Sequence, residues 1–511
     1  MVDNERKLGV MLTYLNIFLN TIVMLAYTPF LLRYLGQSEY GLYIMAMSIL
    51  TYLALLDFGF GNAIIILTSK YIVNNEYRKQ EVLYGTVMLS YYFISVISIL
   101  LMFFFHQIID DVFYNSMTGS EIEILKKVVV ILGINIALSI PGNMFRAVLT
   151  AYERFIFINS VSILRALSIP LLILMVIYFE YRTVTMIAAV SFVNIVFILV
   201  QYIYYKKYIY VKIRISNFDK DVFILAFQYS IFVFIATIAD QVNWNFGQLI
   251  IGSYLGTKAI AVYSIAVLFN TTFIMLSSAV SGVLLPKVSK MIASGASNDQ
   301  LTFEMIKIGR LQSYIVFLIF FGFSLFGEEF IYYWAGSDYT DAYYLTLIIM
   351  APLSIPLMQN LGLSILKAKN KFYFRAISSL VMSLVTITLS LVLIKEFGYW
   401  GISFSIAITF IVLNGIIMNI YYWYIGIDVL NFWREISKVF IPMLIIFIIT
   451  YYIKDYINSK NISTLILEAL LFIMMIINFS YFYIMNKYEK GVLNGMWSKV
   501  NNLVISRKIH K

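Results

Sequence analysis

Long apolar stretches are the feature of this sequence that most constrains its fold. A helix needs about 20 mostly apolar residues to cross the hydrocarbon core of a bilayer. A water-soluble chain could not bury so much apolar surface in one or two cores, whereas a chain surrounded by lipid can leave it exposed. The sequence therefore predicts an all-α polytopic membrane protein with about 14 transmembrane helices. The predicted spans are 9–33, 41–67, 82–105, 125–149, 156–178, 184–205, 221–251, 259–285, 305–327, 341–366, 374–395, 400–424, 435–454 and 463–485.

The overall composition agrees with this prediction. Hydrophobic residues make up 61% of the chain and charged residues only 13%, whereas soluble domains carry about 25% charged residues. The chain also has 40 Tyr and 41 Phe residues, many of them near the ends of apolar segments. Aromatic side chains at these places are typical of a membrane–water interface.

The sequence lacks the residues that most enzymes and metal sites require. It has no cysteine, which excludes disulfides, thiolate metal sites and a cysteine nucleophile. Its two histidines, His106 and His510, fall in a predicted loop and in the tail, which disfavours a histidine metal site or a catalytic triad. Phosphate-binding and dinucleotide-binding motifs are also missing from the sequence. We therefore expect neither an enzyme nor a protein with a resident cofactor or metal.

Basic residues are distributed unequally between the two sets of predicted loops. One set, together with both termini, holds about 27 of the 37 Lys and Arg residues. The other set holds acidic stretches such as Asp110–Asp111 and Glu328–Glu329. Because basic loops stay in the cytoplasm, we predict that both termini are cytoplasmic. The net charge of +10 has the same explanation, and the chain has no basic domain that could hold nucleic acid.

Two groups of residues recur at nearly the same spacing. Tyr34, Leu35, Gly36, Tyr43 and Ala46 match Tyr254, Leu255, Gly256, Tyr263 and Ala266 at an offset of 220. Leu149, Ala151, Arg154, Phe155 and Phe157 correspond to Leu366, Ala368, Lys371, Phe372 and Phe374 at an offset of 217. The offset covers six predicted helices, and an even number preserves their orientation. The pattern therefore predicts two parallel repeats, one of the symmetries found in transporters.

The repeat defines the predicted organisation of the chain. We expect an N-terminal lobe of six helices, a cytoplasmic linker, a C-terminal lobe of six helices, two additional helices and a cytoplasmic tail. These parts cover residues 1–205, 206–220, 221–430, 431–486 and 487–511, respectively.

Three arginines lie within or at the ends of predicted spans. A charged side chain in hydrocarbon costs several kcal/mol, so it tends to face the bundle interior or a watery cavity. Arg165 lies about ten residues, or ~15 Å, into its span, which is too deep for easy snorkelling. Arg146 is nearer the inner interface and Arg33 is at an outer helix end, where snorkelling or interface anchoring would also explain them. We consider all three as candidate ligands for an anionic substrate.

Two aspartates lie within predicted spans. Asp57 and Asp240 could couple transport to H+ or Na+, or they could form structural pairs. Asp57 has a further structural explanation, because Gly59 and Gly61 loosen the helix beside it and leave backbone amides that a carboxylate can cap.

A last group of charges marks the start of the ninth predicted span. Glu304, Lys307 and Arg310 follow one another at intervals of three residues. Side chains at this spacing share one face of a helix. We predict a solvated, amphipathic helix end here.

Two stretches of the sequence carry a family resemblance. The first stretch runs through Tyr34-Leu35-Gly36, Gln37-Ser38-Glu39-Tyr40-Gly41-Leu42-Tyr43 and Leu56-Asp57-Phe58-Gly59-Phe60-Gly61-Asn62-Ala63. It resembles the start of bacterial polysaccharide flippases, including the Wzx-type O-antigen transporters of the multidrug/oligosaccharidyl-lipid/polysaccharide exporter superfamily. The second stretch, from Asp240 through Leu255-Gly256 to Val262-Tyr263, resembles their seventh and eighth helices.

The resemblance implies two six-helix lobes that form a V, with two extra helices. It implies alternating-access export of an undecaprenyl-diphosphate-linked oligosaccharide from the inner to the outer leaflet of the bacterial cytoplasmic membrane. It further implies coupling to an ion gradient or to the membrane potential. The implied partners are the lipid-linked oligosaccharide, membrane lipids and other membrane proteins of polysaccharide assembly. Arg146 and Arg165 would then be the natural ligands of the diphosphate.

Two other functions are alternatives at this stage. A cation-coupled multidrug exporter shares the expected fold, but such exporters usually have twelve helices and an acidic cavity, in contrast to the extra helix pair and the membrane arginines here. A membrane polysaccharide polymerase or ligase generally needs a large outer loop with catalytic residues. The largest predicted outer loop, around His106 to Glu123, has fewer than about 20 residues.

Overall fold

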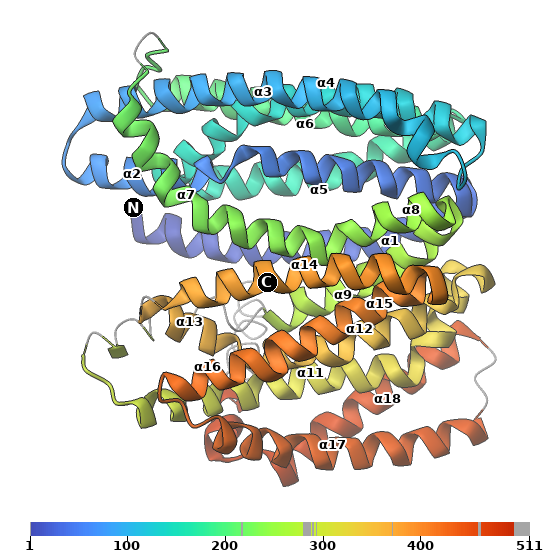
Figure 1. The fold of residues 1–511 in the computed structure, drawn as a ribbon. Helices are drawn as coiled ribbons and strands as arrows, with labels where there is room; N and C mark the ends of the chain where they lie inside the picture. The colour runs from blue at the N-terminus through green and yellow to red at the C-terminus, as the bar shows by residue number, and fades with distance from the viewer. Residues whose placement is uncertain are drawn as a thin grey trace, which may run out of the picture. The chain divides into compact units, whose positions relative to one another are not determined.

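The computed structural model describes residues 2–215, 218–278, 288, 291–292, 294–369, 371–457 and 461–494. All regular elements within these residues are helices (Figure 1). Most of the predicted tail, from residue 495 onward, lies outside the described residues. The predicted all-α fold is confirmed.

The helices are long and apolar enough to cross a membrane many times. The described residues contain 12 such helices, or up to 13 if the bent pair Lys220–Ile231 and Val233–Leu255 forms one span. The first of them, Met11–Asp57, has 47 residues. At 1.5 Å per residue it would extend for ~70 Å, more than twice the ~30 Å of a bilayer core. It contains most of the first predicted span and part of the second, so the structure is compatible with 14.

The described chain separates into two compact units. The first unit comprises Met1–Leu268 and Tyr373–Thr409, and the second comprises Phe269–Phe372 and Phe410–Lys511. These units follow contacts rather than the sequence repeat, so the predicted lobes at 1–205 and 221–430 stay a prediction.

The first unit holds most of the helices. They are α1 (Val2–Ala54), η1 (Leu55–Asp57), α2 (Phe60–Val73), α3 (Tyr77–Phe113), α4 (Gly119–Ala151), α5 (Phe155–Tyr178), α6 (Thr183–Tyr208), α7 (Lys220–Gln241), η2 (Val242–Phe246), α8 (Gly247–Leu255), part of α9 (Thr257–Ser278), α14 (Phe372–Phe397) and α15 (Tyr399–Phe410). Within this unit α4 packs against α3 and α6, and the three helices run side by side in Figure 1.

The second unit includes the additional helix pair near the C-terminus. Its elements are α11 (Asn298–Ala335), η3 (Ser337–Tyr339), α12 (Asp341–Met358), α13 (Asn360–Ala368), η4 (Ile411–Ile417), α16 (Met418–Tyr424), α17 (Val429–Ile457), α18 (Ile462–Phe479) and η5 (Ser480–Ile484). The long helix α11 packs against α12, α17 and α18.

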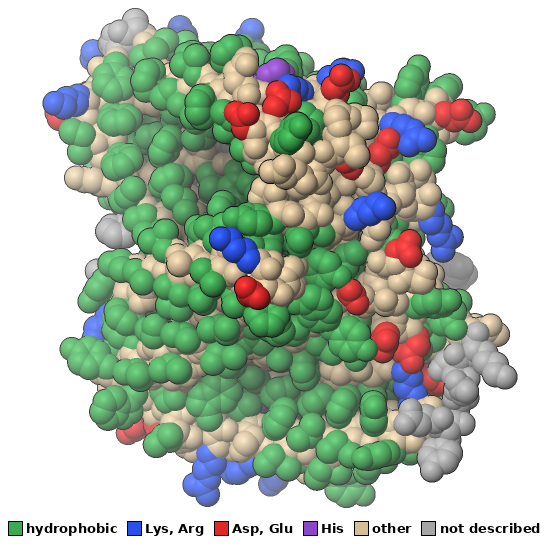
Figure 2. Space-filling model, turned by 45° about the vertical axis from the view of Figure 1, so that its right-hand side comes forward, with side chains coloured by type: hydrophobic (Ala, Val, Ile, Leu, Met, Phe, Trp, Pro, Cys, Tyr) green, Lys and Arg blue, Asp and Glu red, His purple; other side chains and the backbone are tan. Residues whose placement is uncertain are grey.

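Much of the surface of the protein is apolar. Figure 2 shows one face on which hydrophobic side chains predominate. Large side chains such as Phe103, Leu467 and Leu471 are more than half exposed. A surface of this kind is unfavourable in water and favourable against lipid tails, which agrees with a multi-pass membrane protein.

The sequence repeat is also a repeat of backbone geometry. Gly36 and Gly256, at the offset of 220, have nearly the same dihedral angles: φ 70° and ψ 175° for the first, φ 80° and ψ −173° for the second. A positive φ of this kind favours glycine, because a Cβ would be strained there. Both glycines mark the joint between two predicted spans, so the same turn is built twice.

The second pair of matching segments shows the same correspondence. The helices α4 and α13 end at Ala151 and Ala368, which are 217 residues apart. After each end, a backbone N–H returns to the helix: Arg154 N–H donates to the Leu149 carbonyl at 3.0 Å, and Lys371 N–H donates to the Leu366 carbonyl at 2.8 Å. The two helices therefore end with the same backbone hydrogen-bond pattern.

The predicted solvated start of the ninth span is wrong for one residue. Arg310 is only 6% exposed. Its Nε donates to Glu489 Oε1 at 2.6 Å and its Nη1 donates to the Glu435 carbonyl oxygen at 3.1 Å. Tyr314 Oη donates to the other Glu489 oxygen at 3.0 Å. The arginine thus fastens the segment after η5 onto α11 and α17.

This buried pair gives a prediction about stability. In Arg310→Ala the buried Glu489 loses its counter-charge, and breaking a buried ion pair costs about 3–5 kcal/mol. We expect a clearly lower midpoint of thermal unfolding in detergent micelles. The matched control is Lys438→Ala, which removes a largely exposed partner of Glu435 and should cost about 0–1 kcal/mol. Equal midpoints for the two variants would contradict the structural role of Arg310.

Candidate functional site

Two of the predicted arginines line one cavity. Arg146 on α4 and Arg165 on α5 face a cavity of about 270 Å³ in the first unit. The cavity lies between α1, α4, α5 and α6. Its other polar lining residues are Thr51, Ser139, Asn143, Asn194 and Gln201.

Helical spacing places these polar groups on common faces. Ser139, Asn143 and Arg146 are four and three residues apart, so they share one face of α4. Asn194 and Gln201 are two turns apart on α6. Gly142 brings the two helices close together, because a Cβ at this position would come within 2.6 Å of the Ile198 side chain. The cavity is therefore a polar patch built from helices that are otherwise apolar.

The cavity has a positive electrostatic character. Both arginine side chains are exposed even though they lie among packed helices, because they border the cavity. Both line the same cavity, and their like charges repel one another. None of the residues that line the cavity is Asp or Glu, and neither guanidinium forms an ion pair with any described residue. Such a site favours an anion, which two guanidinium groups can bind through charge-assisted hydrogen bonds.

Arg33 is not part of this arrangement. It is an exposed residue of α1 and is absent from the cavity lining. The structure therefore brings two of the three predicted arginines together. Whether any of the three contacts substrate stays a prediction.

Asp57 lies where the second predicted span breaks. Phe58 and Gly59, which follow it, have φ values of 51° and 73°, so the helix ends at Asp57 and restarts as α2. The Asp57 carboxylate lies near Gly61, Tyr91 and Asn143, and its Oδ1 is buried without a hydrogen-bond partner among the described residues. The predicted capping role therefore stays a prediction. Asn143 also lines the arginine cavity, so the break in the span lies close to that cavity.

Asp240 has a different environment. It is an exposed residue near the end of α7, and the positive charge of Arg375 on α14 acts on it. An opposite charge nearby agrees with the structural alternative for Asp240. Its role in ion coupling stays a prediction.

The amides and hydroxyls of the cavity were not predicted as site residues. A signal for some of them exists in the sequence, since Ser139, Asn143 and Arg146 form a polar stripe in an apolar helix. Asn194 and Gln201 give a weaker signal because they lie far apart along α6. Only the packing of α6 against α4 shows that they share one cavity with the arginines.

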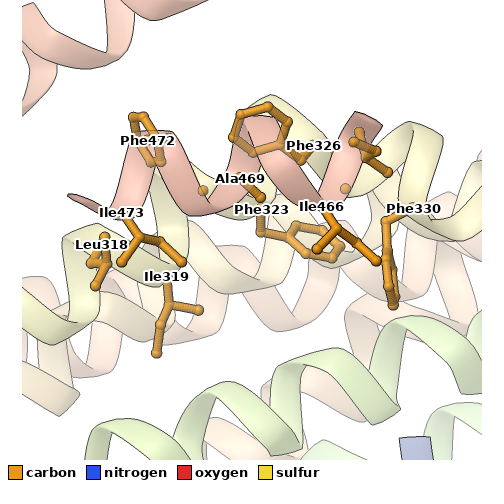
Figure 3. Close-up of a pocket in the computed structure, with 12 residues that line it drawn as sticks. Leu318, Ile319, Phe323, Phe326, Phe330, Ile466, Ala469, Phe472 and Ile473 are labelled. Carbon is orange, nitrogen blue, oxygen red and sulfur yellow. The ribbon is translucent and has the colours of Figure 1, made fainter. Parts of the chain in front are cut away.

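A second hollow, in the second unit, is entirely apolar. It has a volume of about 340 Å³ and lies between α11 and α18 (Figure 3). In the figure Phe323, Phe326 and Phe330 of α11 lie opposite Ile466 and Ala469 of α18. Its lining side chains have no hydrogen-bonding group, so this surface suits hydrocarbon and contrasts with the arginine cavity.

Comparison with protein families identifies the group to which the chain belongs. A family described as polysaccharide biosynthesis protein matches residues 30–344, which is more than half of the chain. The chain belongs to this family. A search of curated proteins found no match to the sequence of this chain.

Solved structures show the fold of this polysaccharide biosynthesis protein. The lipid II flippase MurJ in an inward closed conformation matches with a TM-score of 0.71 and 16% identity, over 93% of this chain and 98% of that one. An inward-facing multidrug resistance MATE family transporter of the MOP superfamily matches with a TM-score of 0.61 and 12% identity, over 83% and 94%. The MATE transporter VcmN of Vibrio cholerae, in a bent form, matches with a TM-score of 0.54 and 12% identity, over 85% and 97%.

These findings confirm the family prediction. The chain belongs to the polysaccharide biosynthesis protein family, and it shares its fold with a lipid II flippase and with multidrug transporters of the MOP superfamily.

The positive character of the cavity gives a prediction that needs no substrate. The chain has no native cysteine, so Asn194→Cys would place a single thiol in the cavity. We expect an anionic methanethiosulfonate reagent to react with this thiol faster, relative to a cationic one, than it does with a free thiol in solution, because two arginines attract the anion. The rates can be measured on detergent-solubilised protein.

The matched control is Asn194→Cys combined with Arg146→Ala and Arg165→Ala. In this background the ratio of the two rates should return to the value in solution. A ratio that does not depend on the arginines would show that the cavity is not cationic.

Proposed function

We propose that this protein flips an undecaprenyl-diphosphate-linked oligosaccharide from the inner to the outer leaflet of the bacterial cytoplasmic membrane by alternating access. The observation that carries the proposal is the cavity in which Arg146 and Arg165 lie together without an acidic neighbour in the lining. Family membership supports a role in polysaccharide assembly. The structural match to a lipid II flippase supports a fold suited to the task.

The chemistry of the cavity fits the parts of such a substrate. A diphosphate presents adjacent negative oxygens, and each guanidinium offers a planar fork of N–H donors that matches them. The amide side chains of Asn143 and Asn194 and the hydroxyl of Thr51 can exchange hydrogen bonds with sugar hydroxyls. A transporter must replace the hydration of the substrate's charged group, because an isolated charge in hydrocarbon costs on the order of tens of kcal/mol.

We further propose that transport is coupled to H+, to Na+ or to the membrane potential through the two aspartates. Asp57 is the better placed of the two, since it lies near Asn143, which also lines the cavity. A change in the charge of Asp57 would alter the interactions of Asn143 and so the lining of the cavity. Asp240, near Arg375, has a more structural setting.

The alternative of a multidrug exporter draws support from the structural matches to MATE transporters. The charge of the cavity opposes it, because two arginines would repel a cationic drug. No observation of the described residues favours the polymerase or ligase alternative.

The role of the two arginines can be tested by export. Each charge-assisted hydrogen bond to the diphosphate contributes about 1.5–3 kcal/mol, so Arg146→Ala combined with Arg165→Ala should reduce surface polysaccharide by at least about tenfold while the protein remains in the membrane. The measurement is surface glycan per unit of membrane-inserted protein. Lys395→Ala, which removes an exposed positive charge of α14 outside the cavity, should leave export unchanged. Full export in the double variant would rule out the cationic-cavity mechanism.

The proposed topology has a separate test. We propose that both termini lie in the cytoplasm, which places Ser337 outside and Asn74 inside. Both residues are exposed. In intact cells a membrane-impermeant maleimide should label Ser337→Cys, whereas Asn74→Cys should react only after the membrane is permeabilised. The reverse pattern would invert the topology.

A further inference from the structure

Three helices of the first unit meet around one carboxylate. Glu121 lies in the first turn of α4, Ser38 lies in α1 just after the kink at Gly36, and Thr257 begins α9. Glu121 Oε1 accepts hydrogen bonds from Thr257 Oγ1 at 2.7 Å and from Ser38 Oγ. The two hydroxyl oxygens are themselves 2.9 Å apart. We call these three residues the clasp.

The other oxygen of the same carboxylate is held by the start of its own helix. Glu121 Oε2 accepts from the Thr118 backbone N–H at 2.8 Å and from Thr118 Oγ1 at 2.9 Å. Both carboxylate oxygens are therefore occupied, and the Glu121 side chain has a fixed position. Of the clasp residues, only Thr257 comes from the second copy of the sequence repeat.

The backbones of the two repeats touch beside the clasp. A Cβ on Gly41 would lie 1.9 Å from the Thr257 carbonyl oxygen. A Cβ on Gly256 would lie 2.4 Å from the Ser116 carbonyl oxygen. Real side chains never approach so closely, so both positions require glycine. The contact between the repeats is therefore tight as well as polar.

A polar seam continues from the clasp along the helices. Ser48 Oγ donates to Gln248 Oε1, and both residues are buried. Further along, Tyr52 Oη donates to the Gln241 carbonyl oxygen at 3.1 Å. Each of these contacts again joins α1 to the α7–α8 region. The clasp is the end of this seam that lies nearest the connections between the helices.

The position of the clasp along the chain assigns it to one side of the membrane. The connections around residues 36, 116 and 256 link the predicted spans one to two, three to four and seven to eight. All three lie on the side opposite the termini, which is the outer side in the proposed topology. The clasp therefore holds the two repeats together at the outer end.

We propose that the clasp of Glu121, Ser38 and Thr257 is the outer gate of the transporter and that it opens in every transport cycle. This inference rests on the proposed function, because alternating access requires the outer contact between repeats to separate. Hydroxyl-to-carboxylate hydrogen bonds suit a reversible gate, since water can replace each partner when the repeats move apart.

The chain's lack of cysteine permits a direct test. Ser38→Cys combined with Thr257→Cys places two thiols where the two hydroxyls now touch. When a short bifunctional thiol reagent joins the two cysteines, the variant should no longer translocate the lipid-linked glycan. A reducing agent that cleaves the link should restore translocation. The matched control is Asp110→Cys with Lys126→Cys. These residues form an ion pair of 2.5 Å between α3 and α4, within one repeat.

The cross-linked control should transport as fast as its reduced form. The proposal is overturned if the Ser38–Thr257 pair transports equally well with and without the link. It is also overturned if the two thiols cannot be linked at all, because the geometry would then be wrong.

A second measurement separates this inference from the proposed function. The reaction rate of Thr257→Cys with a water-soluble thiol reagent reports how often the clasp opens, and it needs no substrate. Adding Glu121→Ala should raise this rate by about tenfold, while Glu121→Gln, which keeps one acceptor oxygen, should raise it less. If the unmodified protein translocates no glycan but the reaction rates of Thr257→Cys change as expected, the flippase proposal is wrong, whereas the role of the clasp in holding the repeats together is supported. If the Glu121 substitutions leave the reaction rate of Thr257→Cys unchanged, the gate proposal is rejected, whereas the flippase proposal is not affected.

Discussion

A guanidinium group that enters hydrocarbon loses its hydration, and this cost shapes much of the first unit. Arg146 and Arg165 have no described counter-ion, so the protein must keep them in contact with water or an anion. The cavity between α1, α4, α5 and α6 meets this need. Its amides and hydroxyls continue the polar lining, and Gly142 allows the helices to close around it. Without an anionic ligand to bind, two like charges placed together would only destabilise the protein.

The same constraint explains how polar groups are used elsewhere. Polar contacts between helices include the seam from Glu121 to Gln241 and the cluster around Arg310. Much of the remaining surface is apolar, which suits contact with lipid. The Arg310 cluster is fully satisfied by Glu489, Glu435 and Tyr314, which suits a fixed joint. The arginine cavity is not satisfied by protein groups, which suits a binding site.

Features that depend on local sequence could be predicted. The apolar spans follow from hydrophobicity alone, and the repeat follows from matching turn residues. Gly36 and Gly256 illustrate this, because their shared positive φ is the physical reason for a recurring glycine. The positions of Arg146 and Arg165 within apolar segments indicate a functional role, and the structure brings both to one cavity.

Features that depend on pairing between distant segments could not be predicted. Arg310 and Glu489 are 179 residues apart, and no local pattern indicates that they meet, so the predicted solvated helix end was wrong for Arg310. Arg375 beside Asp240 and the amides of α6 in the cavity are similar cases. Arg33 lies within α1 and outside the lining of this cavity, and its role as a ligand stays a prediction.

Reconstituted translocation tests the central claim most directly. Purified protein in vesicles should move a fluorescent undecaprenyl-diphosphate glycan between leaflets, as measured by the fraction that a membrane-impermeant quencher can reach. The account predicts translocation that exceeds that of protein-free vesicles and is lost when Arg146 and Arg165 are both replaced by alanine. Translocation that proceeds equally well without the two arginines would contradict it.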